Sequence, residues 1–135
     1  MTYSLFSRCL LAALATAAGL AQAAFAATPI ELLGIYGAQA GTTPQPARGQ
    51  PFFNVTHGRE WSCASCHGAA PVRAGKHAGT GKPIAAMAPA FNPERFTDAA
   101  KTEKWFRRNC NDVTGRECTA AEKADVLSWL LTLKP

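Results

Sequence analysis

Two cysteines and a histidine in the motif Cys63-Ala64-Ser65-Cys66-His67 are the residues of this sequence best suited to do chemistry. Two cysteines three positions apart, with a histidine directly after the second, form the attachment signature of a c-type haem. Thioether bonds from Cys63 and Cys66 would fix the porphyrin edge to the chain. The imidazole of His67 would then lie beneath the ring as the proximal iron ligand. The motif therefore predicts one covalently attached haem c.

A disulfide or half of a zinc site is the alternative interpretation of the same two cysteines. A zinc site needs two further ligands at suitable spacing, and the chain contains no second Cys-x-x-Cys and no pair of histidines separated by three to five residues. A thioredoxin-like redox motif needs a strand–helix–strand context, which the surrounding sequence does not indicate. Haem attachment is therefore the leading interpretation. A non-haem protein with a Cys63–Cys66 disulfide is the alternative.

The first 27 residues have the features of a secretory signal peptide. Arg8 supplies the positive charge, and an apolar run of about 12 residues from Cys9 to Leu20 follows it, too short to span a bilayer. Ala-x-Ala patterns at 21–23 and 24–26 predict cleavage between about residues 23 and 27. We therefore expect a periplasmic protein with one domain, residues 28–135, and no membrane span in the mature chain.

Export changes both the cysteine count and the charge of the chain. Cys9 leaves with the signal, so Cys110 and Cys118 are the two cysteines that haem attachment does not use. In a disulfide-permissive compartment we expect them to pair; two free thiols, exposed to oxidation, are the alternative. Loss of Arg8 lowers the net charge from +5 to +4. This mild, dispersed charge favours an acidic protein partner and does not indicate nucleic acid.

The two ends of the mature chain predict helices that pack on each other. Thr28 can cap the first helix, and Pro29 suits its first position. A capping box formed by Thr119 and Glu122 begins the last helix, whose apolar residues recur at helical spacing from Val126 onward. Together with the scarcity of alternating runs, these patterns predict a small all-α domain wrapped around the haem.

The middle of the chain predicts less regular structure. Pro51 permits a helix in segment 48–55 only if the helix begins near it. Residues 68–93 are rich in glycine and proline, and we expect this loop to wrap the haem edge. A helix is predicted from Thr97 to Arg108, capped by Thr97 or Asp98.

The second axial ligand decides the function, and four residues are candidates for it. Methionine or histidine is the usual choice in an electron carrier, and Met87 lies in the loop 20 residues beyond His67. His57 and His77 have no recognisable supporting element. The amide oxygen of Asn109 is a hard donor that suits ferric iron better than ferrous iron, so an asparagine ligand would leave on reduction. The alternatives are a core position for Met87 and a helix C-cap for Asn109.

Several short motifs resemble the sphaeroides haem protein family of monohaem cytochromes c, in the same order and over nearly the whole mature chain. The matching stretches are 63–69, 73–75, 80–82, 93–98, 103–105, 108–111, 115–116, 118–119, 122–125, Leu127 and 129–130. The Arg-Asn-Cys-Asn stretch at 108–111, with the second cysteine at 118, is the most specific of them. The segment before the haem motif departs most from the family, because it is shorter and contains His57.

The resemblance implies a class I cytochrome c fold and an iron held by His67 and Asn109. It implies a disulfide between Cys110 and Cys118, and an asparagine that leaves the iron on reduction. It also implies that the ferrous haem binds oxygen, nitric oxide or carbon monoxide, and that a dihaem cytochrome c is the type of electron donor.

We therefore expect an exported monohaem cytochrome whose ferrous haem binds a diatomic gas after a partner cytochrome reduces it. Reduction of bound oxygen, or conversion of nitric oxide by it, would make the protein an enzyme. The alternative is a conventional class I electron carrier with Met87 as permanent sixth ligand.

Overall fold

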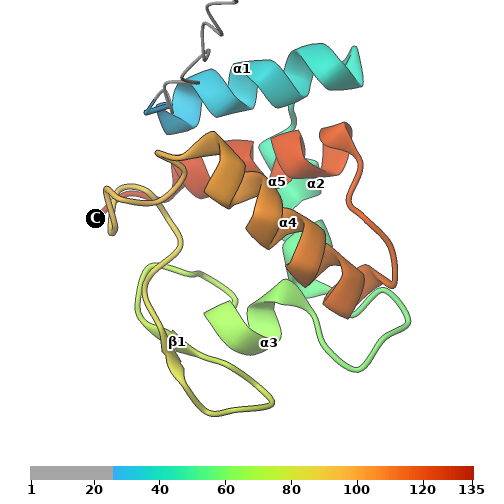
Figure 1. Cartoon of the computed structure of the whole chain (residues 1–135), viewed down its shortest axis with the longest axis vertical. Helices are drawn as coiled ribbons and strands as arrows, with labels where there is room; N and C mark the ends of the chain where they lie inside the picture. Colours follow the sequence, from blue (N-terminus) through green and yellow to red (C-terminus); the bar gives the residue numbers. More distant parts are fainter. Residues whose placement is uncertain (1–25) are drawn as a thin grey trace, which may run out of the picture.

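The computed structural model describes residues 26–135 and shows a mainly helical chain, as predicted (Figure 1). The elements in order are α1 (Pro29–Ala40), α2 (Pro46–Asn54), α3 (Cys63–His67), β1 (Gly75–Lys76), β2 (Pro83–Ile84), α4 (Ala99–Thr114) and α5 (Ala120–Thr132). Most of the predicted signal peptide lies outside the described residues. Among the helices of the described part, none is long and apolar enough to cross a membrane.

The first and last helices begin at capping boxes and pack on each other, as predicted. In α1 the Thr28 hydroxyl accepts a hydrogen bond from the Glu31 amide at 3.2 Å, and the Glu31 carboxylate accepts one from the Thr28 amide at 2.7 Å. Thr119 and Glu122 repeat this exchange in α5 at 3.2 and 2.8 Å. Each box satisfies amides that the first turn of a helix leaves free.

One hydrophobic core joins three of the helices. Leu32 and Tyr36 of α1, Phe53 of α2, and Leu127 and Leu130 of α5 are all at most 2% exposed. Cys63, Phe106 and Met87 pack against this cluster from α3, α4 and the loop before α4. The core therefore reaches every segment that carries a candidate haem residue.

The expectation for segment 48–55 is wrong, because α2 begins at Pro46 and contains Pro51 in its interior. Packing against α5 outweighs the backbone hydrogen bond that this proline removes. The buried carboxylate of Asp125 accepts from the Arg48 Nε at 2.7 Å and from the Gln45 amide at 2.6 Å. Gly49 lies so close to α5 that an added Cβ would come within 2.0 Å of the Asp125 carbonyl oxygen.

The predicted end of the helix after Thr97 is also wrong. Asp98 is the N-cap, as one of the two expected residues, but α4 continues past Arg108 to Thr114 and ends at Gly115, where φ is 74°. The buried side chains of Cys110 and Val113 extend the inner face of α4 by a further turn. Asn109 therefore lies inside the helix, so the C-cap interpretation of this residue is wrong.

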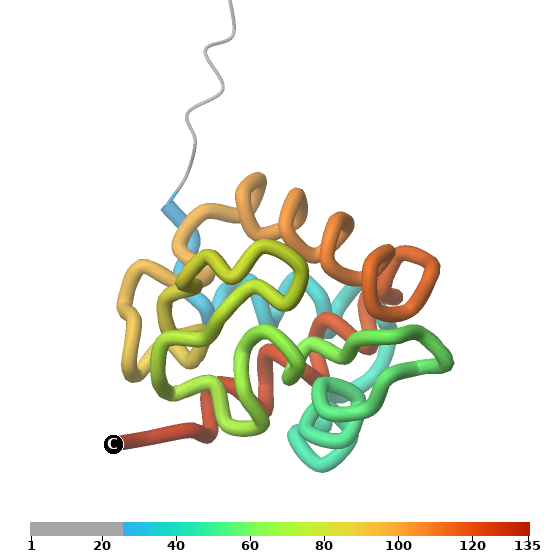
Figure 2. The backbone as a smooth tube through the Cα atoms, turned by 90° about the horizontal axis from the view of Figure 1, so that it is seen from below, coloured from blue at the N-terminus to red at the C-terminus, as the bar shows by residue number. Residues whose placement is uncertain are grey.

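The loop that follows His67 contains one short antiparallel hairpin. Gly75 pairs with Ile84, and Lys76 pairs with Pro83. Figure 1 shows this hairpin next to α3, and Figure 2 shows it from below on the near face of the molecule. Apart from it the loop is irregular up to α4, as the glycine and proline content predicts.

Candidate haem-binding site

A single helical turn, α3, positions the three residues of the haem motif. Ser62 is its N-cap: the Ser62 hydroxyl accepts from the Ser65 amide at 3.2 Å, and the Ser65 hydroxyl accepts from the Ser62 amide at 3.0 Å. A helical turn places positions i, i+3 and i+4 on the same side. Cys63, Cys66 and His67 therefore point from one face of α3. Ser62 and Ser65, three residues apart, are the signal in the sequence for this cap.

The two cysteines of the motif are not joined in a disulfide, so both sulfurs are available for thioether bonds. Burial raises the pKa of Cys63 to about 11, and the neighbouring Cys66 adds to the effect. The Cys66 Sγ lies at the surface of the motif and accepts a hydrogen bond of 3.3 Å from the Ala78 amide. One sulfur is thus directed to the core and the other to the hairpin.

The buried imidazole of His67 has the protonation state that binds a metal ion. Burial and, to a smaller extent, the positive charge of Arg95 lower its pKa to about 4. The ring is therefore neutral at pH 7, which is the form that binds iron. The ring centroid of His67 lies 6.2 Å from that of Phe53, so the core supports the side chain from α2.

The hairpin is packed directly on α3, and Gly75 is the point of contact. A Cβ at this position would lie 2.1 Å from the Cys66 carbonyl oxygen and 3.0 Å from the His67 Cα. Both atoms belong to the backbone, so they cannot turn aside as a side chain can. The hairpin and the haem motif therefore keep their relative positions only with glycine at residue 75.

Replacement of Gly75 by alanine should lower the free energy of unfolding by about 1 to 2 kcal/mol, because the methyl group overpacks this contact. Gly79→Ala is the matched control in the same hairpin, since a Cβ there meets its nearest neighbours at 3.7 Å, an ordinary contact. The control should change stability by less than about 0.5 kcal/mol. Urea unfolding of both proteins measures the difference, and equal losses would contradict the close approach of Gly75 to Cys66.

Asn109 offers an uncommitted amide on α4. Its side chain is partly buried and forms no hydrogen bond to any residue of the range 26–135. Asn111, two residues later, behaves differently, because its amide nitrogen donates to the Arg107 carbonyl at 2.8 Å. A partly buried amide without an internal partner is available to a ligand or a metal.

Of the other three candidates for the sixth ligand, His57 and His77 each have a ring nitrogen in a hydrogen bond, and Met87 packs against the hydrophobic core. The Met87 amide donates to the Pro71 carbonyl at 3.0 Å, so Met87 lies beside the segment that directly follows His67. The His57 Nε2 is 2.8 Å from the Phe52 carbonyl oxygen, and the two rings are 4.3 Å apart. The His77 Nδ1 accepts from an amide of its own turn at 3.2 Å.

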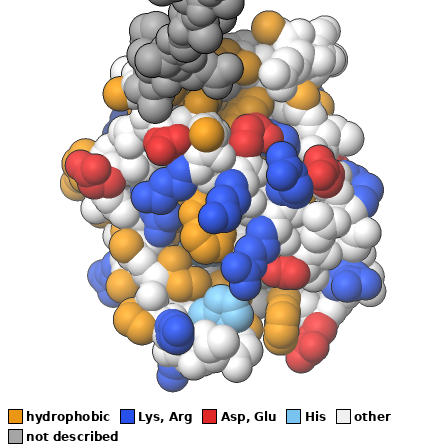
Figure 3. Space-filling view, viewed as in Figure 1, with side chains coloured by type: hydrophobic (Ala, Val, Ile, Leu, Met, Phe, Trp, Pro, Cys, Tyr) orange, Lys and Arg blue, Asp and Glu red, His pale blue; other side chains and the backbone are white. Residues whose placement is uncertain are grey.

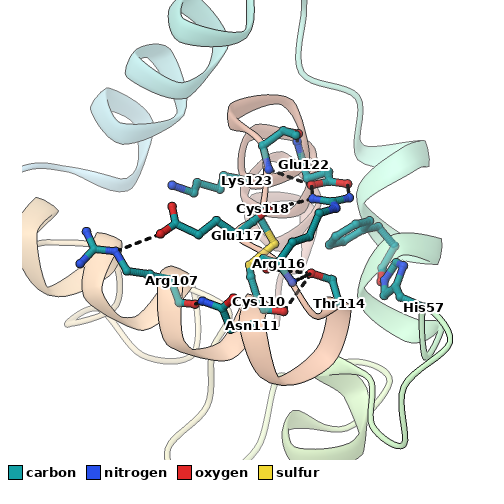
Figure 4. Close-up of a disulfide and its surroundings, with 12 residues drawn as sticks. His57, Arg107, Cys110, Asn111, Thr114, Arg116, Glu117, Cys118, Glu122 and Lys123 are labelled. Carbon is teal, nitrogen blue, oxygen red and sulfur yellow. Dashed lines mark hydrogen bonds and ion pairs between the residues drawn. A yellow bond between two sulfur atoms is a disulfide. The ribbon is translucent and has the colours of Figure 1, made fainter.

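A disulfide joins the candidate ligand helix to the start of α5. Cys110 and Cys118 have an Sγ–Sγ distance of 1.97 Å and a Cα–Cα distance of 5.5 Å (Figure 4). The Arg116 guanidinium donates to both carboxylate oxygens of Glu122 at 2.8 and 2.6 Å. This is a second contact between the α4–α5 loop and the start of α5. The turn after Asn109 is therefore tied to the helix that packs on α1.

The described residues fit a group that carries negative charge beside His67. Arg95 is partly buried, and no acidic side chain of the described chain forms an ion pair with it. Its Nε and one terminal nitrogen donate to the carbonyls of Ala86 and Ala85 at 3.0 and 2.9 Å, which leaves the other terminal nitrogen free. Burial of an unpaired cation is costly, and the propionates of a haem would supply the missing charge. No local pattern in the sequence indicates this role of Arg95.

Comparison with known proteins is in line with this site. A family model described as a domain of unknown function, DUF1924, matches residues 39–130. The cytochrome c-type protein SHP of Cereibacter sphaeroides is 49% identical over 107 residues, which are 76% of this chain and 82% of that protein. Cytochrome c'' of Methylophilus methylotrophus is 43% identical over 93 residues, 66% of this chain and 65% of that protein.

Solved structures agree with the sequence matches. The structure of oxidised SHP, described as an oxygen-binding cytochrome c, superposes with a TM-score of 0.75 at 46% identity and covers 80% of this chain and 99% of that one. Oxidised cytochrome c'' superposes with a TM-score of 0.70 at 37% identity and covers 79% and 95% of the two chains.

Proposed function

This chain belongs to the SHP family of c-type cytochromes, and we propose on that basis that it is an exported gas-binding cytochrome whose distal ligand depends on the oxidation state of the iron. It has the predicted all-α, class I cytochrome c-like fold and carries one covalently bound haem c. In the proposal, Cys63 and Cys66 hold the haem, His67 is the proximal ligand and Asn109 is the distal ligand.

The observation that carries the proposal is the free amide of Asn109 on a helix fixed at both flanks. A weak ligand needs a rigid support to be held at a metal. The Cys110–Cys118 disulfide fixes α4 next to Asn109, and an ion pair of 2.7 Å between Glu103 and Lys123 fixes its preceding turns to α5. The description of the SHP structure as an oxygen-binding cytochrome supports the gas-binding part of the proposal.

Met87 is a poorer candidate for the distal ligand than Asn109. The Met87 side chain packs against the hydrophobic core, and its backbone amide is bonded to the Pro71 carbonyl. The Asn109 amide, in contrast, forms no hydrogen bond within residues 26–135.

The redox dependence follows from the chemistry of an amide oxygen. This hard donor binds ferric iron adequately and the softer ferrous iron poorly. With haem bound, reduction would weaken this bond, and the Asn109 side chain would turn away from the iron. The ferrous haem supplies the binding site for oxygen, nitric oxide or another diatomic gas. The Asn109 amide N–H remains nearby as a hydrogen-bond donor to the bound gas.

The proposal also includes the compartment in which the protein acts and the protein that reduces it. Residues 1–27 act as a signal peptide that directs the chain to the periplasm, where a redox partner, a dihaem cytochrome c by the family resemblance, reduces the haem. Conversion of the bound gas would be an additional activity of the reduced state.

The visible spectrum of the haem-loaded protein, oxidised and then reduced, with and without carbon monoxide, tests the proposal. We expect a six-coordinate ferric form and a five-coordinate, high-spin ferrous form that binds carbon monoxide readily. A ferrous form that stays low-spin and does not react with carbon monoxide would contradict it, because a permanent sixth ligand such as Met87 would then be present.

A further inference from the structure

The loop around the β1–β2 hairpin carries positive charge without any acidic residue. From Ala69 to Pro93 the chain contains no aspartate or glutamate, while it contains Arg73, Lys76 and Lys82. All three of these side chains are exposed, and within residues 26–135 none of them forms an ion pair. We name Arg73, Lys76 and Lys82 the basic hairpin.

Several cations outside the hairpin have acidic partners. Ion pairs in the described part of the chain join Arg48 to Asp125, Arg107 to Glu117, Arg116 to Glu122 and Lys123 to Glu103. Four of the ten Lys and Arg side chains that residues 26–135 contain outside the hairpin therefore have their charge offset within a few ångström. The basic hairpin keeps its full positive potential toward solvent and toward any approaching molecule.

The basic hairpin is ordered and lies against the haem motif. The His77 amide donates to the Lys82 carbonyl at 2.8 Å, and the Gly81 amide donates to the His77 carbonyl at 2.8 Å, so the turn is closed by its own backbone. The Ala78 amide donates to the Cys66 Sγ at 3.3 Å. The sulfur that holds one edge of the haem thus touches the hairpin directly.

We propose that the basic hairpin is the docking surface for an acidic redox-partner protein, which passes an electron to the haem at the edge held by Cys66. This inference rests on the proposed function, in which a partner protein reduces the haem. One electron leaves the reduced centre of the partner and reduces ferric iron to ferrous iron; no covalent bond forms or breaks in the transfer.

The chemistry of the hairpin favours a protein partner over a lipid surface. Its tip consists of Ala78, Gly79, Thr80 and Gly81, which offer little apolar area for insertion between lipids. The large exposed hydrophobic side chains of the described residues, Ile30, Ile35, Val55 and Trp105, all lie elsewhere. Transient redox complexes have small interfaces and depend on electrostatic steering, which three unpaired cations provide.

The outer face of α4 is the competing basic surface and supplies a matched control. Lys101, Lys104 and Arg108 are exposed there, and Figure 3 shows Lys and Arg side chains over this face. They share the helix with Asp98 and Asp112, each within about one turn of one of the cations, so their potential is partly offset. A triple charge reversal on either surface changes the net charge of the protein equally.

The experiment compares the rate of reduction of three haem-loaded ferric proteins by stopped flow. They are the unaltered protein, the variant Arg73→Glu/Lys76→Glu/Lys82→Glu and the variant Lys101→Glu/Lys104→Glu/Arg108→Glu. A reduced flavodoxin serves as the acidic one-electron donor at low and high ionic strength, and an uncharged flavin semiquinone serves as the small donor. We expect the hairpin variant to be slower with flavodoxin by about tenfold at low salt and to lose its salt dependence. The α4 variant should be slower by less than about threefold, and the uncharged donor should reduce all three at the same rate.

Four results would overturn the inference. Equal slowing of both variants would mean that only net charge matters, and a slower α4 variant would place docking on α4. If the uncharged donor also reduces the hairpin variant more slowly, the defect lies at the haem and not in docking. A hairpin variant that keeps its rate with flavodoxin but no longer binds phosphatidylglycerol vesicles would assign the surface to anionic lipid. Carbon monoxide binding to the same reduced proteins reports on the proposed gas site separately, so failure of one proposal is distinguishable from failure of the other.

Discussion

Replacement of Asn109 by alanine should change the visible spectrum of the ferric protein from that of a six-coordinate to that of a five-coordinate haem, because the variant lacks the proposed distal ligand. Added azide or imidazole should bind ferric iron about tenfold or more tightly, since it no longer competes with an internal ligand. The carbon monoxide spectrum of the ferrous protein should change little, because Asn109 has already left the iron in that state. Visible absorption spectroscopy and ligand titration of the haem-loaded protein measure all three effects.

Two matched variants separate this effect from a general disturbance of α4. Asn111→Ala removes the neighbouring asparagine, whose amide is bonded to the Arg107 carbonyl, and should leave both spectra unchanged. Met87→Leu keeps the volume of a side chain that packs on the core and removes its sulfur. A ferric spectrum that responds to Met87→Leu and ignores Asn109→Ala would identify a conventional electron carrier instead.

Features that depend on a few neighbouring residues were predictable from the sequence. The spacing of Cys63, Cys66 and His67 indicates haem attachment by itself, because one helical turn determines where all three side chains point. The same holds for the capping boxes at Thr28 and Thr119, where each partner lies three residues away. The all-α fold follows from these helices and is confirmed.

Features that depend on contacts between distant segments were not predictable in the same way. Pro51 lies inside α2 because Asp125, far along the chain, binds Arg48 and the Gln45 amide. The hairpin strands have two residues each, too short for an alternating pattern, and their position is set by the approach of Gly75 to the Cys66 carbonyl. No local pattern reveals either contact.

The two halves of the candidate site differ in the same way, one being local in sequence and the other not. The proximal half lies within five consecutive residues and could be predicted from the motif alone. The distal half depends on Asn109, for which local chemistry also allowed a helix C-cap and only the family resemblance favoured ligation. The unpaired charge of Arg95 beside His67 depends on how the loop folds back, so it has no counterpart in the sequence pattern.

The double replacement Cys110→Ser/Cys118→Ser should lower the free energy of unfolding by about 2 to 3 kcal/mol. The two cysteines are eight residues apart in sequence, and closing a loop of that size removes about this much conformational entropy from the unfolded chain. Urea unfolding of the haem-loaded ferrous protein gives the value. A thiol reductant is the matched control, because it should destabilise the unaltered protein by a similar amount and leave the double variant unchanged.

The same variant tests whether the disulfide supports the distal ligand as well as the fold. Cys110 directly follows Asn109, so loss of the bond to Cys118 frees the last part of α4 from α5 and weakens the hold on the amide. We therefore expect the ferric double variant to show a fraction with the spectrum of the Asn109→Ala variant well below the unfolding transition, which a purely global loss of stability would not produce. A ferric spectrum that stays unchanged until the protein unfolds would restrict the disulfide to a role in stability. The rigidity that keeps a weak ligand on ferric iron would then have to come from the Glu103–Lys123 ion pair and the packing of α4 alone.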